Sequence, residues 1–275
     1  MSIDTKDKIS DEEIKSLATA IKTRYGIDFT NYELKSLKRG FGRLISKHQM
    51  NSLLDLWAAV LRDKAFFLAC IDDLTVNLTE MFRNPEVWVF LRATLRDHFQ
   101  KDQTISIWHA GCSTGEEVYS MLYVIQSLMF GYKTRVIATD LSKNALNLAR
   151  AGRYFGPPAK KYQANFDKTF PGERWDNIMQ EMEEGFMVKD RLRKGIDFRE
   201  HNLVKDAFPE QLDIIFCRNV MIYFDGALKK RVMMNFYKAL KPHGLLVVGY
   251  YDMMPDGFQE FFSVYDNKTK IYIKV

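Results

Sequence analysis

The stretch from residue 105 to residue 140 constrains the fold of this chain more than any other. Its first part, Ile105-Ser106-Ile107-Trp108, predicts a short strand, and the residues from Glu116 to Met129 predict a helix. The turn between them carries Gly111 and Gly115, and glycine lets a backbone approach a ligand closely. A strand, a glycine-bearing turn and a helix N-terminus form the first unit of a nucleotide-type α/β site.

A second predicted strand, from Arg135 to Asp140, ends in an acid. A carboxylate at that place can accept hydrogen bonds from both ribose hydroxyls of an adenosine. Glu116 and Glu117 stand where the pyrophosphate of a dinucleotide would lie. Two acids repel phosphate but suit a ligand with a sulfonium and an ammonium group. We therefore expect S-adenosylmethionine (SAM) rather than a nicotinamide cofactor, with a site that binds no cofactor as the other alternative.

The bulk properties are those of a globular protein with a large core. Of the 275 residues, 47% are hydrophobic and 27% are charged, which suits one large or two modest domains. No run of about 18 apolar residues occurs, so we expect no membrane insertion. The N-terminus lacks an apolar signal region, and Cys70, Cys112 and Cys217 are well separated, which indicates a cytoplasmic protein with reduced thiols. No cysteine or histidine spacing indicates a metal site, and a net charge of +5 does not single out nucleic acid.

The chain divides into a helical part and an α/β part. We expect a helical N-terminal domain with a linker over residues 1–80, where a capping box at 10–13 precedes the first apolar stripe and Asn31 can cap the second helix. Strands alternating with helices over 81–275 predict a mostly parallel sheet.

An inserted subdomain is expected over residues 152–195, where the periodicity is weak. Within and beside it we predict a helix over 173–184 and a pair of short strands, 186–188 and 196–199. Residues 241–244 are predicted to form a turn before the last buried strand.

Five basic residues gather on the second predicted helix, opposite its apolar stripe. Four of them form one i,i+4 row and the fifth lies beside it: Lys35, Arg39, Arg43 and Lys47, with Lys38. A solvated helix face is one interpretation of such a row. A docking face for an acidic partner is the other.

Polar residues also follow other predicted strands. In an open α/β sheet ligands bind at the carboxyl ends of strands, and Asn202, Arg218 and Asn219 are placed there like Asp140. The connector between the domains adds three more polar candidates, Asn77, Thr79 and Arg83, which serve either ligand binding or interdomain hydrogen bonds.

These motifs, taken together, are similar to those of a known family. The matching stretches are Asn77-Leu78-Thr79-x-x-Phe82-Arg83, Ser113-Thr114-Gly115-Glu116-Glu117-x-Tyr119-Ser120, Ala138-Thr139-Asp140, Asn202-Leu203 and Ile215-Phe216-Cys217-Arg218-Asn219-Val220-Met221-Ile222-Tyr223-Phe224-Asp225. In them the chain resembles the CheR-type chemotaxis receptor methyltransferases, which are SAM-dependent protein-glutamate O-methyltransferases. The resemblance implies a class I SAM-dependent methyltransferase fold, which is a Rossmann-like α/β fold with a mostly parallel sheet. It also implies an all-helical N-terminal domain and a small inserted β-subdomain.

The resemblance also implies the residues of the site. The SAM site would consist of Asn77, Thr79, Arg83, Glu117, Asp140, Asn202, Leu203, Cys217 and Arg218, beside Gly111 and Asn219 from the pattern of turns and strand ends. Arg83 and Tyr223 would lie near the transferred methyl group as catalytic residues. For Tyr223 a packed aromatic is the alternative, and for Cys217 core packing or backbone contact to adenine is expected.

The expected activity is methylation of glutamate carboxylates on the cytoplasmic domain of chemoreceptors or a related signalling protein. A monomer would perform it and leave S-adenosyl-L-homocysteine (SAH). One alternative is a non-catalytic SAM-binding signalling scaffold, which the departures from the family pattern at Met81 and Val118 allow. The other is a nucleic-acid methyltransferase. The lack of an Asn/Asp-Pro-Pro-aromatic motif at 218–221 argues against this alternative. Residues 249–252 also depart, with Gly-Tyr-Tyr-Asp in place of Gly-His-Ser-Glu near the expected substrate entrance.

Overall fold

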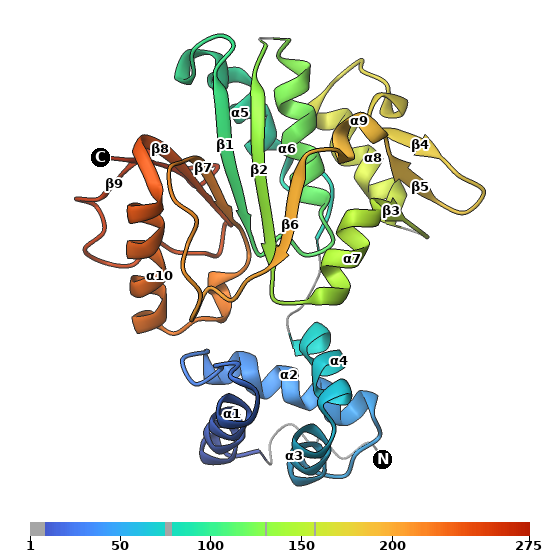
Figure 1. The fold of residues 1–275 in the computed structure, drawn as a ribbon, viewed down its shortest axis with the longest axis vertical. Coiled ribbons are helices and arrows are strands. Elements are labelled where there is room, and N and C mark those ends of the chain that lie inside the picture. The colour runs from blue at the N-terminus through green and yellow to red at the C-terminus, as the bar shows by residue number, and fades with distance from the viewer. Residues whose placement is uncertain (1–8, 75–78, 130, 157) are drawn as a thin grey trace.

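The computed structural model describes residues 9–74, 79–129, 131–156 and 158–275, and these form two domains (Figure 1). The smaller, helical domain consists of α1 (Asp11–Tyr25), α2 (Leu34–Lys47), α3 (Leu53–Arg62) and α4 (Lys64–Leu74). The predicted capping box is confirmed, because the side chains of Ser10 and Glu13 each bond to the other's backbone N–H. Buried side chains from all four helices close one core, with Ile14, Phe41 and Phe67 among them. None of the helices in the described ranges is long and apolar enough to cross a membrane.

The prediction that Asn31 caps α2 is wrong. Glu33 is the N-cap residue, and its side chain makes no capping hydrogen bond. The carbonyl of Asn31 instead accepts the backbone N–H of Asp225 at 2.9 Å. The segment before α2 is therefore fixed by the α/β domain rather than by its own helix.

The larger domain is built on a seven-stranded sheet with the order β6-β2-β1-β7-β8-β10-β9 (Figure 1). In chain order its main elements are α5 (Pro85–His98), β1 (Thr104–Ala110), α6 (Glu116–Ser127), β2 (Lys133–Asp140), α7 (Lys143–Ala151), β6 (Ile196–Glu200), β7 (Leu212–Cys217), η3 (Met221–Tyr223), α10 (Gly226–Ala239), β8 (Leu240–Val248), β9 (Phe262–Asp266) and β10 (Ile271–Lys274). The strands from β6 to β8 pair in parallel, and β10 runs antiparallel to both of its neighbours. The prediction of a mostly parallel, Rossmann-like sheet is thus confirmed.

The predicted turn at 241–244 is wrong, because these residues lie inside β8. Leu240 already pairs with Leu212 of β7, and the register shifts between Leu212 and Ile214 to accommodate the irregular stretch. The ammonium of Lys241 also binds both carboxylate oxygens of Asp213, at 2.8 and 2.9 Å. The next pair after Leu240 is Leu245 with Ile214, so residues 241–244 form a bulge within β8, where His243 has a φ of +61°.

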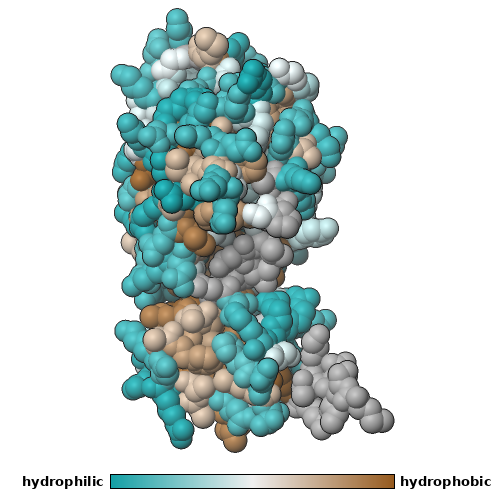
Figure 2. Space-filling view, turned by 90° about the vertical axis from the view of Figure 1, so that its right-hand side faces the viewer, coloured by the Kyte–Doolittle hydropathy of each residue, from teal (hydrophilic) through white to brown (hydrophobic). Residues whose placement is uncertain are grey.

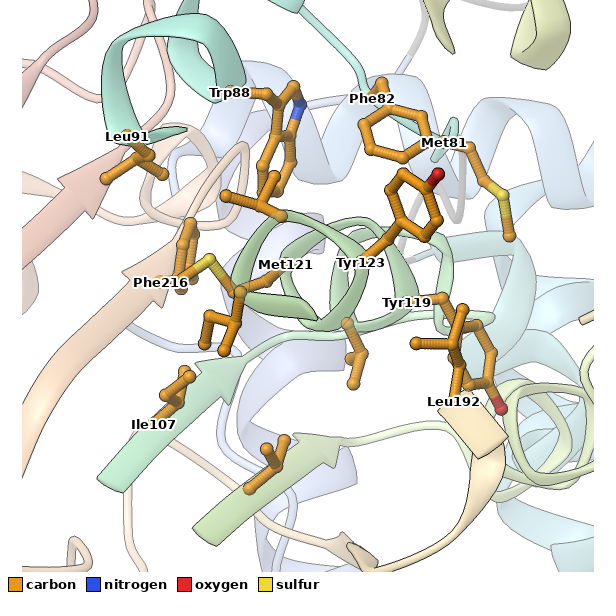
Figure 3. Packing of buried hydrophobic residues seen from close by; sticks show 14 of the residues in the cluster. Met81, Phe82, Trp88, Leu91, Ile107, Tyr119, Met121, Tyr123, Leu192 and Phe216 are labelled. Atoms are coloured by element: carbon orange, nitrogen blue, oxygen red, sulfur yellow. The ribbon is translucent and has the colours of Figure 1, made fainter. Parts of the chain in front are cut away.

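Aromatic side chains join α5 and α6 to the sheet (Figure 3). Trp88 stacks on Phe216 of β7 with ring centroids 5.8 Å apart, and Phe82 meets Trp88 edge to face at 6.0 Å. Met81 and Val118, two of the departures from the family pattern, are fully buried in this cluster. Both residues therefore contribute to the packing of the core.

The inserted part consists of β3 (Arg153–Tyr154), α8 (Pro158–Thr169), η2 (Trp175–Asn177), β4 (Met179–Glu181), β5 (Phe186–Val188) and α9 (Asp190–Arg193). The helix predicted over 173–184 is wrong, because Met179 pairs with Val188 in a three-stranded sheet ordered β3-β5-β4. The predicted strand pair is also wrong, since β5 pairs with β3 and β4 of this small sheet and β6 pairs with β2. Long-range pairing overrides the local apolar spacing in both cases.

Candidate functional site

A cavity lies between the domains, at the carboxyl ends of β1, β2, β6 and β7. Its walls include most of the residues that the sequence predicts for the cofactor site: Thr79, Arg83, Gly111, Glu117, Asp140, Asn202, Leu203, Arg218 and Asn219. Tyr223, the second predicted catalytic residue, also lines it. The helical domain closes it from the other side with Tyr32 and Leu74. Figure 2 shows the two domains as stacked lobes, with hydrophobic side chains at the top of the lower lobe.

The glycine turn after β1 fixes the position of the Asp140 carboxylate. Gly111 has a φ of +83°, and a Cβ there would overlap the side chain of Val220, so the turn requires glycine. One oxygen of Asp140 accepts the N–H of Ser113 at 2.8 Å, and the other accepts the N–H of Ser142 at 2.9 Å. The hydroxyl of Ser113, buried at the cavity wall, has no hydrogen-bond partner among the described residues. An oriented carboxylate beside an unused hydroxyl fits the ribose of an adenosine.

The two acids at the start of α6 have different roles. Glu117 lines the cavity and binds His109 Nδ1 at 2.9 Å and the Arg218 guanidinium at 3.4 Å. Burial opposes its ionisation, but His109 and Arg218 outweigh burial and lower the pKa of Glu117. The anion is therefore available to an ammonium group of a ligand.

Glu116 does not line the cavity, contrary to the sequence argument that paired it with Glu117. Its carboxylate accepts hydrogen bonds from Tyr162 at 2.9 Å and Thr114 at 2.6 Å, and burial raises its pKa. Because Tyr162 belongs to α8, this buried acid joins the glycine turn to the inserted part.

Two arginines and a tyrosine form the wall at the end of β7. The guanidinium of Arg218 donates to the carbonyl of Arg83 at 3.0 Å and to Asn84 Oδ1 at 2.8 Å, and thereby holds the connector. Burial raises the pKa of Tyr223, and the nearby positive charges of Arg43, Arg39 and Arg83 oppose that rise. Tyr223 therefore remains a hydroxyl donor at neutral pH, in the field of three arginines.

Two predicted cofactor residues are not part of the cavity wall as described. Asn77 lies outside the described residues. Cys217 is completely buried in the core between β7, β8 and α10, where burial raises the pKa of its thiol, so it packs at the end of its strand rather than lining the cavity. Tyr32 and His201, which were not predicted from the sequence, line it, and so does Tyr251, which belongs to the departing stretch near the expected substrate entrance. Ser113 was quoted in the glycine motif without a role.

Four of the five predicted docking residues on α2 are exposed, and Lys38 is half-buried. The charges of Arg39 and Arg43 reach Tyr223 at the cavity. At the far end of the helix, Lys47 forms an ion pair with Asp73 at 2.8 Å, and Arg43 also donates to the Asp73 carbonyl at 3.0 Å. The end of α2 near Arg39 is therefore the part of the row best placed to meet a substrate.

Asp252, in the stretch that departs from the family pattern, holds the ends of β7 and β8 together. Its carboxylate accepts the backbone N–H groups of Asn219 and Gly249. Burial nonetheless raises the pKa of Asp252 from 3.8 to about 6. The folded protein therefore binds this proton more tightly than the unfolded chain does.

A pH-dependent loss of stability follows from this shift. As pH rises from about 3 to about 7, the unfolding free energy of the wild type should fall relative to that of Asp252→Asn, by on the order of 3 kcal/mol. Denaturant unfolding of both proteins across this pH range measures the difference. Parallel stability curves for the two proteins would contradict the assignment.

The sequence matches the family described as CheR methyltransferase, SAM binding domain, over residues 77–271, and the one described as CheR methyltransferase, all-alpha domain, over residues 12–75. The chain belongs to the CheR methyltransferase family. Similar proteins include a Pseudomonas putida protein provisionally named methyltransferase Cher3, which is 28% identical over 270 residues, with 98% of this chain and 97% of its own length covered. Chemotaxis protein methyltransferase 1 of Vibrio cholerae is 29% identical over 274 residues, with 96% and 97% covered. The chemotaxis protein methyltransferase of Borreliella burgdorferi is 33% identical over 192 residues, with 66% and 65% covered.

Membership of the CheR family makes the chain a SAM-dependent methyltransferase with a class I fold and an all-helical N-terminal domain. The cavity contains groups that suit two parts of SAM. Asp140 and Ser113 suit the ribose, and the Glu117 anion suits the methionine ammonium.

Proposed function

We propose that this CheR-family enzyme methylates glutamate side chains on the cytoplasmic part of chemoreceptors or a related signalling protein. The observation that carries the proposal is that Arg83 and Tyr223 line the cavity together, and that the charges of Arg39 and Arg43 on α2 act on Tyr223. Cationic and hydroxyl donors suit an incoming carboxylate, whereas a nucleobase amino group would need acceptors. The names of the Vibrio and Borreliella relatives, which are chemotaxis protein methyltransferases, support the same substrate class.

The reaction requires little of the protein beyond alignment of the substrate carboxylate with the methyl group. SAM, when bound, supplies an electrophilic methyl group on a sulfonium. A substrate glutamate is ionised at neutral pH, since its ordinary pKa is about 4.3, and needs no general base. Arg83 would orient the attacking carboxylate by two parallel hydrogen bonds, and Tyr223 would donate a third. Arg218, whose guanidinium binds Glu117 and the connector carbonyl, would keep this wall rigid.

A non-catalytic scaffold receives no support from the departures at Met81 and Val118. Both side chains pack in the core, and neither lines the cavity.

Incubation of the chain with methyl-labelled SAM and membranes containing host receptors tests the proposal. Label should enter a receptor-sized band and not DNA or RNA; binding of SAM without transfer to any protein would favour the scaffold.

The row of basic residues on α2 (Lys35, Arg39, Arg43 and Lys47), called the α2 row below, should act in substrate docking. Reversing Arg39 and Arg43 to glutamate should raise the KM for receptor about tenfold and leave SAH affinity unchanged, because these charges would attract an acidic receptor helix. Raising the salt concentration from roughly 50 to 300 mM should likewise raise the KM of the wild type for receptor. A methylation assay with varied receptor concentration measures both effects.

A matched control is available in the same domain. The double variant Lys15→Glu/Arg24→Glu makes the same change of net charge on the exposed face of α1, and neither residue is among the charges that act on Tyr223. It should behave like the wild type. Equal KM values for the two double variants would show that the α2 row is only a solvated face.

A further inference from the structure

The segment that precedes α2 is joined to the loop that carries Tyr223. The backbone N–H of Glu33 donates to the carbonyl of Tyr223 at 2.8 Å, and the N–H of Asp225 donates to the carbonyl of Asn31 at 2.9 Å. Tyr32 and Phe224 form an antiparallel bridge between these two bonds. A short piece of two-stranded ladder thus connects the helical domain directly to one of the two predicted catalytic residues.

The Tyr32 side chain continues from this ladder into the cavity. Its ring meets Phe29 edge to face at 5.0 Å and Phe224 at 5.2 Å, which fixes its direction. Tyr32 lines the cavity wall with Asp140 and Leu74. Burial raises its pKa, and the negative charge of Asp140 raises it further. Asp28 and Tyr223 add smaller effects in the same direction. The hydroxyl is therefore protonated, and it faces the same cavity as the carboxylate predicted to hold the ribose.

We propose that Tyr32 is a cofactor-binding residue of the helical domain, which covers the nucleoside half of SAM opposite Asp140. Its ring would shield the ribose from water, and its hydroxyl would donate a hydrogen bond within the Asp140 and ribose network. The ladder from Asn31 to Glu33 then makes cofactor binding and docking of the helical domain mutually dependent. By reciprocity, a substrate that steadies the helical domain increases the affinity for SAM by the same factor by which SAM increases the affinity for that substrate.

Titration of three variants with SAH tests the binding role without any methyl transfer. Tyr32→Ala should weaken SAH binding about tenfold, a loss typical of one buried aromatic contact. Tyr32→Phe keeps the ring and should show a smaller loss, about threefold. The matched control is Tyr25→Phe, because Tyr25 is another tyrosine of the helical domain, with its hydroxyl bonded to the carbonyl of Val60 at 2.6 Å, and it does not line the cavity. It should bind SAH like the wild type, and a wild-type dissociation constant for Tyr32→Ala would overturn the proposal.

Hydrogen exchange of the unmodified chain gives a second readout that does not depend on how a variant folds. Adding SAH should slow amide exchange in residues 28–34 of the helical domain, because the N–H of Glu33 lies in the ladder. Residues 53–62 of α3, in the same domain, should change little. Equal exchange of residues 28–34 with and without SAH would show that the helical domain takes no part in cofactor binding. Both experiments use the cofactor product alone, so they remain decisive whichever substrate the enzyme methylates.

Discussion

Replacing Asp140 by asparagine should weaken SAM and SAH binding about 100-fold or more. The wild-type carboxylate is a charged acceptor whose two oxygens are oriented by the N–H groups of Ser113 and Ser142. Asparagine has nearly the same shape but presents an NH₂ group to one of these donors and loses the charge-assisted bonds to the ribose. Calorimetric titration with SAH measures the effect.

Asp197→Asn is the matched control for this prediction. Asp197 is an exposed residue on the neighbouring strand β6, so the same loss of charge there should leave SAH affinity unchanged. If Asp140→Asn binds SAH as tightly as the control does, the cofactor lies elsewhere and the assignment of the cavity fails.

Replacing Arg83 by alanine should reduce methyl transfer at saturating SAM by about 100- to 1000-fold, which is the usual cost of removing one donor aimed at the reacting group. Arg83 lines the cavity beside Thr79 and Glu80, and its charge reaches Tyr223. Arg83→Lys should recover only a small part of the rate, because an ammonium lacks the planar fork that fits a carboxylate. Single-turnover kinetics together with thermal unfolding separate this loss from instability. Wild-type turnover in Arg83→Ala would remove the residue from the mechanism.

The central part of the fold was predictable because its signals are local. The strand, turn and helix from Thr104 to Ser127 and the strand ending at Asp140 follow from apolar runs and the glycines of the turn. The errors fall where distant strands decide the structure. Met179 pairs with Val188, and Lys241 binds Asp213, and neither partner can be found from local spacing.

The cavity was predictable to the extent that it depends on strand ends. Because the carboxyl ends of parallel strands meet at one edge of a sheet, Asp140, Asn202 and Arg218 were expected to converge, and they line one cavity. The separation of Glu116 from Glu117 was not predictable, since it depends on a hydroxyl from α8. Tyr32 was missed for a similar reason: its position comes from the docking of the helical domain, for which the sequence around it carries no signal.

The stability of the methyl product in alkali tests the central claim most directly. Receptor labelled by the wild-type enzyme from methyl-labelled SAM should release its label as methanol in mild base, because a glutamate methyl ester hydrolyses there, and peptide mapping should place the label on glutamate. A receptor in which those glutamates are changed to glutamine should take up no label at the same sites. Label that survives base treatment, as N-methyl groups do, would contradict carboxylate methylation as the activity of this enzyme.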